Sequence, residues 1–529
     1  MKLSYDDKSI KVFTFDREAV KKATKENPVW VHFGCGNIFK AFHAAVMQRL
    51  LNAGLTDKGI IVAEGFDYEI IDLMSKPQDD LAMSVTLKAD GSIEKEIIGS
   101  IVESVKLDSN DEKEYSRMKE IFRAASLQFT TFTITEKGYN LNNVDGSIRN
   151  DVKEDFEAGP EKPQSYIGKV AGLLYERFVN GAYPIAMVST DNCSHNGDKL
   201  KASVMAYAKA WEESGKCEKG FNSYLEDESK VTFPWSMIDK ITPRPDDSVK
   251  QMLLDCGFTD VENVETSKHT FVAPFVNAEE AEYLVIEDKF PNGRPCLEKG
   301  GVIFTDRETV DKVERMKVCT CLNPLHTSLA VFGCLLGYTK ISDEMKDEDL
   351  VKLVNTVGYT EGLPVVINPG IIDPKEFIDT VVQKRIPNPF MPDTPQRIAC
   401  DTSQKVGIRF GQTIKKYAES PDLDINNLKC IPLVLAAWCR YLMGLDDNGN
   451  AFEASPDPMY DELSVPFKKV ALGSSIDVHE LLKPLLSRAD IFGSDLYEVG
   501  LGLKIENYFT ELIAGPGAIR ATLHKYANN

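Results

Sequence analysis

The chain has 529 residues, of which 43% are hydrophobic and 27% are charged, and its formal net charge at pH 7 is −20. This length exceeds one ordinary hydrophobic core and predicts two large domains. The acidic balance disfavours nucleic acid and anionic membrane as partners, because both repel negative charge, but it still permits a locally basic site for a small anion.

The cysteines indicate neither disulfides nor a metal site. Eleven of them are scattered along the chain, without a CxxC pair or a His/Cys cluster at zinc spacing. Cys319 and Cys321 are too close together for a standard structural zinc site, so we expect buried thiols and no metal.

The N-terminus lacks the apolar core of a signal peptide. No uninterrupted apolar run approaches the roughly 18 residues that span a bilayer, and the nearest, residues 431–439, contains Pro432. We therefore expect a cytoplasmic protein that does not enter a membrane.

A glycine turn follows the first clear β-rich run, residues 28–33, and a helical pattern comes directly after it. Strand, glycine turn and helix in this order favour a dinucleotide, because backbone N–H groups at a helix start can approach a pyrophosphate. The third position of the GxGxxG pattern is Phe39, which makes the pattern weak by itself. The residues expected to line a cofactor are Gly34, Gly36, Asn37, Ile38 and Phe39.

Two acidic residues follow the second predicted strand, residues 59–63. Glu64 or Asp67 could hold the ribose hydroxyls of NAD and would repel the 2′-phosphate of NADP. No arginine lies between Val62 and Ser75 to accept that phosphate. NAD is therefore the expected cofactor, and two solvated loop acids are the alternative interpretation.

Two further predicted strands end in polar loops, which is where doubly wound sheets place their ligands. Residues 127–135 lead into Glu136 and Lys137, and residues 184–189 lead into a loop that contains Asn192. The asparagines of this second loop are alternatively turn formers.

The pattern of the sequence changes near residue 300, where β-rich runs become rare and helical periodicity takes over. The Pro/Gly-bearing segment 286–300 predicts a boundary between an α/β domain, residues 1–290, and a mostly helical domain, residues 291–529. Helical periodicity then dominates residues 347–357, 429–445 and 479–487.

Residues 314–326, ERMKVCTCLNPLH, bring a carboxylate, an ammonium, an amide and an imidazole together. Asn323-Pro324 predicts a helix start with Asn323 as its cap, and apolar residues recur at helical spacing from Leu325. Glu314 and Lys317 would be neighbours on one helix face. A purely structural interpretation is an ion pair, a cap and a core histidine.

Nine stretches of the chain, in order, resemble the long-chain polyol-specific dehydrogenases, the family of mannitol 2-dehydrogenase, fructuronate reductase and mannitol-1-phosphate 5-dehydrogenase. They are GCGNIFKAF, KPQDDLAMSVTLKADGSIEKEIIGSI, TITEKGY, STDNCSHNG, SMIDKITP, VIEDKFPNGRP, ERMKVCTCLNPLH, RIACDTSQK and LAAWCRYLMG. The resemblance implies a Rossmann-type N-terminal domain, a mostly helical C-terminal domain and an active site between them. It also implies NAD or NADP, no metal, and exchange of a ketose-type carbonyl for a secondary alcohol.

The resemblance places the family's catalytic lysine at Lys317. A buried lysine can exchange a proton with a substrate alkoxide near neutral pH. Asn192 and Asn323 match positions whose amide N–H groups would stabilise the developing oxyanion. The other matched pocket residues are Asp239, His326 and Glu314, the last as a proton relay to solvent.

The sequence departs from the family's spacing at one point. Five residues separate Lys317 from Asn323, where the family usually has four. One extra residue rotates a helix by about 100°, and strict spacing would put Val318 in the lysine position. We expect a local bulge between Lys317 and Asn323, as is often found at functional sites.

Arg397 and Lys405 match positions at the far end of the substrate. On a helix they would lie a little over two turns apart, within about 40–80° of the same face. Two converging cations suit a carboxylate, although the mannitol enzymes bind hydroxyls there. We expect a small sugar-acid substrate, with D-fructuronate reduced to D-mannonate.

Two other functions stay open at this stage. One is interconversion of D-mannitol and D-fructose, or oxidation of another polyol, and the other is a non-catalytic nicotinamide-binding relative that keeps the fold. The expected oligomeric state is a monomer or a small homo-oligomer.

Overall fold

The computed structural model describes residues 9–244, 247–259 and 261–528. Contacts divide the chain into two compact units. Unit 1 comprises Met1–Leu87 and Ser92–Asp311, and unit 2 comprises Lys88–Gly91 and Lys312–Asn529. The domain boundary between residues 290 and 291 stays a prediction.

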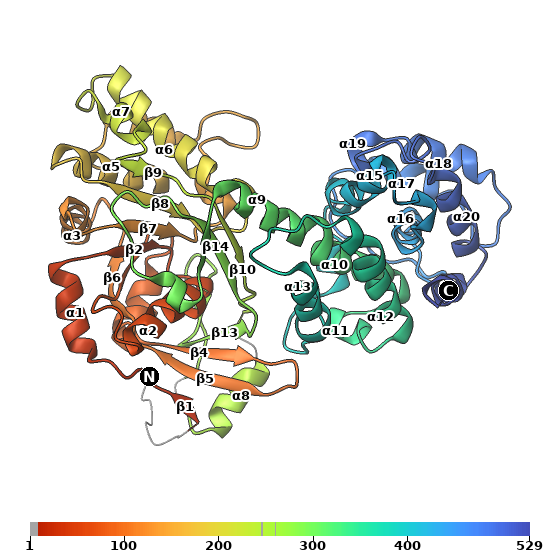
Figure 1. The fold of residues 1–529 in the computed structure, drawn as a ribbon, viewed down its shortest axis with the longest axis horizontal. Helices are drawn as coiled ribbons and strands as arrows, with labels where there is room; N and C mark the ends of the chain where they lie inside the picture. Colours follow the sequence, from red (N-terminus) through yellow and green to blue (C-terminus); the bar gives the residue numbers. More distant parts are fainter. Residues whose placement is uncertain (1–8, 245–246, 260, 529) are drawn as a thin grey trace. The chain divides into compact units, whose positions relative to one another are not determined.

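Unit 1 is built around a six-stranded parallel sheet (Figure 1). The chain adds strands outward from β2 in one direction and then returns to add the rest on the other side, so the strand order reverses between β2 and β7. This is the switch point at which doubly wound sheets bind ligands. From edge to edge the strands are β6 (Ile101–Lys106), β3 (Ile60–Glu64), β2 (Trp30–Phe33), β7 (Phe129–Phe132), β8 (Ile185–Ser189) and β9 (Val231–Thr232).

Helices cover both faces of this sheet, because alternate residues of each buried strand point to opposite sides. Val31 and Ile61 join a core with α3 (Glu112–Arg123), α5 (Tyr166–Val179) and α6 (Asn196–Glu213). Trp30 and Ile60 join a second core with α2 (Ala44–Asn52). The helices α1 (Arg17–Glu26), α4 (Asn150–Ala158), α7 (Phe221–Glu226) and α8 (Asp247–Asp255) complete the unit.

Three smaller sheets accompany the parallel one. The strands expected at residues 28–33, 59–63, 127–135 and 184–189 are all confirmed, whereas β4 and β5 were not predicted. The smaller sheets are β1 (Ile10–Lys11), β5 (Ile93–Ile98), β4 (Ala82–Leu87) and β13 (Phe275–Glu279); β10 (Ser236–Asp239), β14 (Tyr283–Glu287) and β15 (Ile303–Thr305); and the hairpin β11 (Val264–Glu265) with β12 (Phe271–Val272).

Unit 2 is helical, as expected from the helical periodicity of its sequence. Its core contains α10 (Asn323–Leu336) and α16 (Cys430–Tyr441), which are apolar nearly all round and packed against each other. The other helices are α11 (Ile341–Glu344), α12 (Glu348–Asn355), α13 (Pro374–Thr380), α14 (Pro395–Ile398), α15 (Gln412–Glu419), α17 (Tyr460–Phe467), α18 (Val478–Leu486), α19 (Ala489–Phe492), α20 (Gly502–Leu512) and α21 (Ala518–Ala527); α9 (Arg307–Met316) crosses the division between the units.

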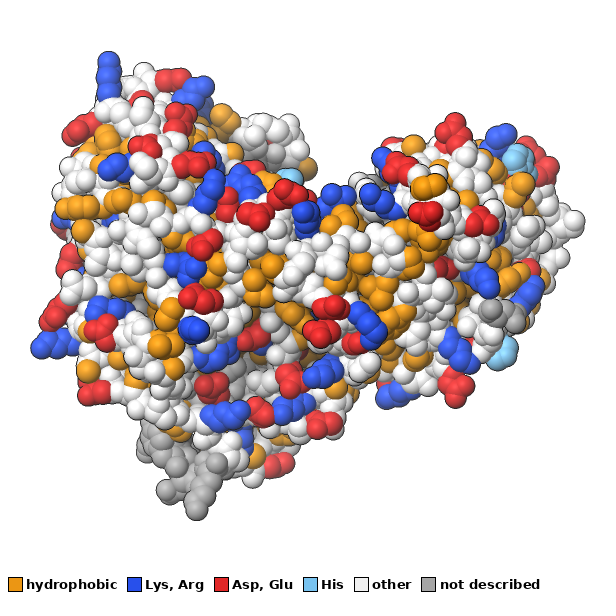
Figure 2. Space-filling model, viewed as in Figure 1, with side chains coloured by type: hydrophobic (Ala, Val, Ile, Leu, Met, Phe, Trp, Pro, Cys, Tyr) orange, Lys and Arg blue, Asp and Glu red, His pale blue; other side chains and the backbone are white. Residues whose placement is uncertain are grey.

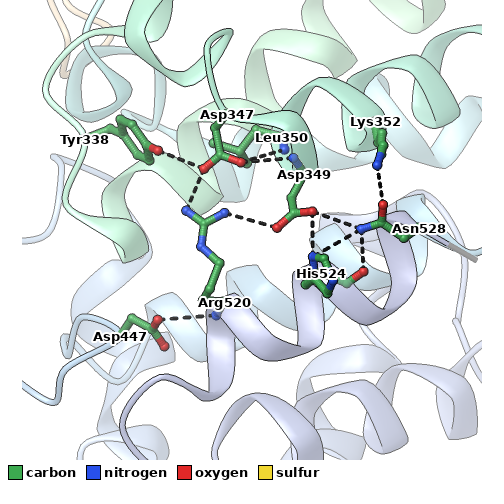
Figure 3. A network of polar contacts seen from close by, with 9 residues as sticks. All are labelled: Tyr338, Asp347, Asp349, Leu350, Lys352, Asp447, Arg520, His524 and Asn528. Atoms are coloured by element: carbon green, nitrogen blue, oxygen red, sulfur yellow. Dashed lines mark hydrogen bonds and ion pairs between the residues drawn. The ribbon is translucent and has the colours of Figure 1, made fainter.

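The C-terminal helix α21 is fastened to α12 by a polar network (Figure 3). Arg520 pairs with Asp347 at 2.6 Å and with Asp349 at 3.4 Å, and His524 Nδ1 lies 2.9 Å from Asp349. Tyr338 donates to the same Asp347 carboxylate at 2.8 Å. These contacts order the end of the chain, which otherwise frays easily.

On the face drawn in Figure 2, acidic and basic side chains are interspersed. Among the described residues, the stretch 307–336 is long and apolar enough to cross a membrane, since an 18-residue window within it has a mean hydropathy of 1.4; the search for uninterrupted apolar runs did not find it. However, 83% of that window is buried, as in a core helix of a soluble protein. No group of three or more potential metal ligands occurs in the part of the chain that the structure describes.

Candidate functional site

The glycine turn lies at the switch point, directly after β2. Gly34 has a φ of +106°, and its N–H donates to the Ala63 carbonyl at 2.9 Å. A Cβ at Gly34 would lie 2.4 Å from the Thr133 carbonyl oxygen, so only glycine fits there. A Cβ at Gly36 would meet nothing within 4 Å among the described residues, so this side of the turn has open space.

The helix after the turn begins at Asn37 and becomes π-helical from Phe39 to His43. Its first N–H groups have no partner within the helix, and Asn37 and Ile38 are only half-buried. Phe39 is fully buried and stacks on the His32 ring at 4.2 Å, so it packs the core where a third glycine would stand. The open space at Gly36 and the helix start together fit a dinucleotide pyrophosphate.

Glu64, at the end of β3, fixes the glycine turn. One carboxylate oxygen accepts the Cys35 N–H at 2.8 Å, and the other accepts the N–H groups of Phe66 at 2.8 Å and Asp67 at 3.0 Å. The side chain is 5% exposed, and both of its oxygens accept hydrogen bonds from backbone N–H groups of this chain. This arrangement makes Asp67 the better placed of the two acids for a ribose.

Asp67 lies beneath the tip of the β11–β12 hairpin. Its carboxylate accepts the Thr266 hydroxyl at 2.6 Å, and Asp67 is only 2% exposed. Lys268 donates to the Phe66 carbonyl at 2.6 Å, and its ammonium lies 4.3 Å from the centre of the Phe66 ring. A ribose could reach Asp67 only after this tip moves.

Glu136 and Lys137 are exposed at the end of β7, beside the switch point, and Glu136 pairs with Lys199. The neighbouring backbone is held by Asp191, which accepts the Ile134 N–H at 3.0 Å and the Thr135 N–H at 2.8 Å. Burial raises the pKa of the Asp191 carboxyl. Asp191 therefore ties the loop after β7 to the loop after β8.

Asn192 follows Asp191 and is exposed. The other asparagine of this loop, Asn196, is structural, since it donates to the Asp191 and Ser236 carbonyls, both at 3.0 Å, and accepts the Ser236 N–H. Asp239 is the last residue of β10 and is 8% exposed. Asp191 and Asn196 thus anchor the loop on both sides of Asn192.

Lys317 begins a π-helical turn, Lys317–Cys321, which we call the lysine turn. The Leu322 N–H donates to the Lys317 carbonyl at 3.0 Å, five residues back, so the extra residue of the sequence is absorbed in this turn. The bulge expected between Lys317 and Asn323 is confirmed. Lys317 is 3% exposed, and burial raises the pKa of the Cys321 thiol to about 12, as expected for buried thiols.

Asn323 is the first residue of α10, so the predicted helix start is confirmed, but its predicted role as the cap is wrong. The cap is Leu322, whose carbonyl accepts the first helical bond, from the His326 N–H at 3.1 Å. The reason is that the lysine turn runs directly into α10 and leaves no extended residue before Asn323. Glu314, at the end of α9, is half-buried, as is His326 in the first turn of α10.

The expectation that Arg397 and Lys405 share one helix is wrong. Helix α14 ends at Ile398, and Asp401 has a φ of +53°, which breaks any continuation. Arg397 pairs with the buried Asp393, and the Lys405 ammonium donates to the Cys400 carbonyl at 2.6 Å. Each cation therefore has a partner within five positions of itself in the sequence.

Family models cover most of the chain. The mannitol dehydrogenase Rossmann domain matches residues 29–299, and the mannitol dehydrogenase C-terminal domain matches residues 309–511. The D-mannonate oxidoreductase of Thermotoga maritima is 56% identical over 97% of this chain and 94% of its own length. The chain belongs to the mannitol dehydrogenase family. The resemblance and the fold class expected from the sequence are therefore confirmed.

Two solved structures share the fold of this mannitol dehydrogenase family member. A D-sorbitol dehydrogenase in substrate-free form has a TM-score of 0.79 and 25% identity, with 97% of this chain and 98% of the other covered. The Pseudomonas fluorescens mannitol 2-dehydrogenase, in ternary complex with NAD and D-mannitol, has a TM-score of 0.68 and 24% identity, with 99% and 97% covered.

Sequence reasoning missed three residues of this family member. Thr266 and Lys268 reach the loop after β3 from about 200 positions away, and no local pattern marks them. Arg409 donates to the Thr327 hydroxyl, next to His326. Its spacing of four from Lys405 was the available signal, because on a helix such residues share a face.

Proposed function

We propose that this protein is an NAD-dependent oxidoreductase that interconverts D-fructuronate and D-mannonate. The observation that carries the proposal is the 56% identity, over nearly the full length of both chains, to a protein named D-mannonate oxidoreductase. Mannitol dehydrogenase family models over residues 29–299 and 309–511 support the class of reaction. A metabolic enzyme of this kind fits a cytoplasmic protein whose partners are small molecules.

The cofactor is proposed to bind at the switch point of the parallel sheet. Gly34, Gly36 and Asn37 would receive the pyrophosphate, with Glu64 holding the turn in shape, and Asp67 would receive the ribose hydroxyls. Bound NAD supplies the hydride acceptor for the alcohol, and NADH the donor for the ketone. The carboxylate of Asp67 disfavours a 2′-phosphate by charge repulsion.

Lys317 is proposed as the general acid that protonates the substrate oxygen during reduction and as the base in reverse. Its place in a buried π-helical turn supports the assignment, because such turns concentrate at functional sites. Asn192 and Asn323 are proposed to donate hydrogen bonds to the same oxygen as negative charge develops on it. Proton transfer by Lys317 and hydrogen bonds from Asn192 and Asn323 to the substrate oxygen need no metal ion.

The remaining family positions complete the proposal. Asp239 and His326 would line the pocket, Glu314 would relay the proton to solvent, and Arg397 and Lys405 would contact the far end of the sugar chain. Glu136 and Lys137 would contact the cofactor beside the switch point.

The test is a spectrophotometric screen of D-fructuronate, tagaturonate, D-fructose and fructose 6-phosphate with NADH and with NADPH. We expect the highest kcat/KM for D-fructuronate with NADH. A higher kcat/KM for D-fructose would refute the sugar-acid assignment and favour mannitol 2-dehydrogenase activity. Quenching of NADH fluorescence on binding, without turnover of any ketose, would instead identify a non-catalytic relative.

A further inference from the structure

Another π-helical turn, Gly407–Gly411, packs against the lysine turn within unit 2. We call it the arginine turn, because it carries Arg409. This packing sets the turn that carries Arg409 against the turn that begins with Lys317, although 92 positions separate the two residues in the sequence.

Glycines fix the direction in which Arg409 points. A Cβ at Gly407 would lie 2.6 Å from the Ile491 carbonyl oxygen, and a Cβ at Gly411 would lie 2.3 Å from that of Phe492. The side of the turn that carries the glycines therefore packs directly against the backbone of α19. Arg409 is two positions from each glycine, so it projects from the opposite side, toward Thr327 on α10.

Among the residues that the structure describes, the Arg409 guanidinium has no anionic partner. Within the described part of the chain its one hydrogen bond goes to the neutral Thr327 hydroxyl, and it forms no ion pair. Burial lowers the pKa of Arg409 to about 10, so the group is still charged at neutral pH. Arg409 is half-buried, and a partly desolvated cation without a counter-charge is costly, so a bound anion would offset that cost.

A second cation lies beside Arg409. Lys405 is four positions earlier in the sequence. Burial lowers the pKa of its ammonium, and the positive charge of Arg409 lowers it further, by a smaller amount. The nearest carboxylate oxygen to Lys405 belongs to Asp401, at 3.9 Å. Arg397, in contrast, is already neutralised by Asp393, and 64% of its side chain is exposed. An anion would therefore gain more at Arg409 than at Arg397.

We propose that Arg409 binds the carboxylate of the substrate and thereby selects a sugar acid over a neutral ketose or polyol. This inference rests on the proposed function, because it names the group that recognises the acid. A guanidinium can hold a carboxylate through two parallel hydrogen bonds, and the free N–H groups of Arg409 supply the donors. Thr327 fixes the guanidinium so that these donors stay oriented.

The test measures binding and turnover in Arg409→Gln. Calorimetry should show D-mannonate affinity lowered by about 30- to 100-fold, with D-mannitol affinity changed less than about twofold. The KM for D-fructuronate should rise by a similar factor. Arg409→Lys keeps the charge but not the fork of donors, so it should lose about tenfold, and it decides the question if the Gln variant does not fold.

Lys415→Gln is the matched control. It removes a cation from the adjoining helix α15, where the side chain is 57% exposed and faces Glu419. Affinity for both ligands should stay within twofold of wild type. Equal losses for D-mannonate and D-mannitol in the Arg409 variants, or no loss for D-mannonate, would overturn the assignment. A wild-type protein that does not reduce D-fructuronate would instead refute the proposed function itself.

Discussion

Replacement of Glu344 by glutamine should remove a large pH dependence from the stability of unit 2. Glu344 ends the short helix α11, is 0% exposed, and neither carboxylate oxygen has a hydrogen-bond partner among the described residues. Burial, with a smaller contribution from Asp347, raises the pKa of this carboxyl to about 9. Because α11 packs against α10, this ionisation affects the helix that begins at Asn323 and carries His326 in its first turn.

The sign and size follow from proton linkage. The pKa of a glutamate in the unfolded chain is about 4.5, so at intermediate pH the folded protein binds one more proton than the unfolded chain. The stability contributed by the neutral acid is fully present below pH 4.5 and is lost as the pH rises toward 9. At about 1.4 kcal/mol per pH unit, the loss between pH 5.5 and 8.0 is about 3 kcal/mol.

The assay is native-state hydrogen exchange of peptides from α10 and α11 in wild type and Glu344→Gln. The opening free energy of the variant, minus that of wild type, should increase by about 3 kcal/mol from pH 5.5 to 8.0. Glu348→Gln, an exposed acid on α12, should show a difference that is constant with pH. A constant difference for Glu344→Gln as well would show that this carboxyl ionises as it does in water.

Four further outcomes are expected. Lys317→Ala should lower kcat by about 10²–10⁴-fold or more with NADH affinity within a few-fold of wild type, and near-normal turnover would refute its role. Stopped-flow and steady-state assays should give a higher kcat/KM for NADH than for NADPH, because Asp67 repels the 2′-phosphate, and equal values would contradict that. Thr266→Val should raise NADH affinity about tenfold in a fluorescence titration, since it frees the Asp67 carboxylate; unchanged or weaker binding would show that the hairpin tip does not compete with the ribose. Arg520→Leu should destabilise the C-terminal helix by about 1 kcal/mol, seen as faster exchange of its amides than in wild type, whereas unchanged exchange would show that its ion pair with Asp347 contributes nothing.

Local patterns determined much of the architecture. Strand, glycine turn and helix identified the first βα unit, because burial of a strand and a tight turn both leave marks within a few neighbouring residues. The helices near residues 347–357, 429–445 and 479–487 were found by the same periodicity. Comparison with the spacing usual in the resembled family also predicted the bulge between Lys317 and Asn323, because a helix can absorb one inserted residue as a π-helical turn.

The partners of charged side chains were decided by the tertiary structure. Glu64 and Asp67 are both acids after the same strand. Glu64 accepts a hydrogen bond from the Cys35 N–H, whereas Asp67 accepts one from the hydroxyl of Thr266, which is 199 positions away. Arg397 and Lys405 have helical spacing, but Asp401 breaks the helix between them.

Apart from its spacing of four from Lys405, Arg409 carries no local mark in the sequence. It differs from the other cations through its surroundings: glycines in the same turn, the Thr327 hydroxyl as its hydrogen-bond partner, and no ion pair with a carboxylate of the described residues. Periodicity reports how much of a segment is buried, because burial acts on each residue separately. Charge pairing depends on which distant residues meet, and sequence order does not fix that, so the sequence determined the scaffold, whereas the fold decided which charged side chains pair with one another.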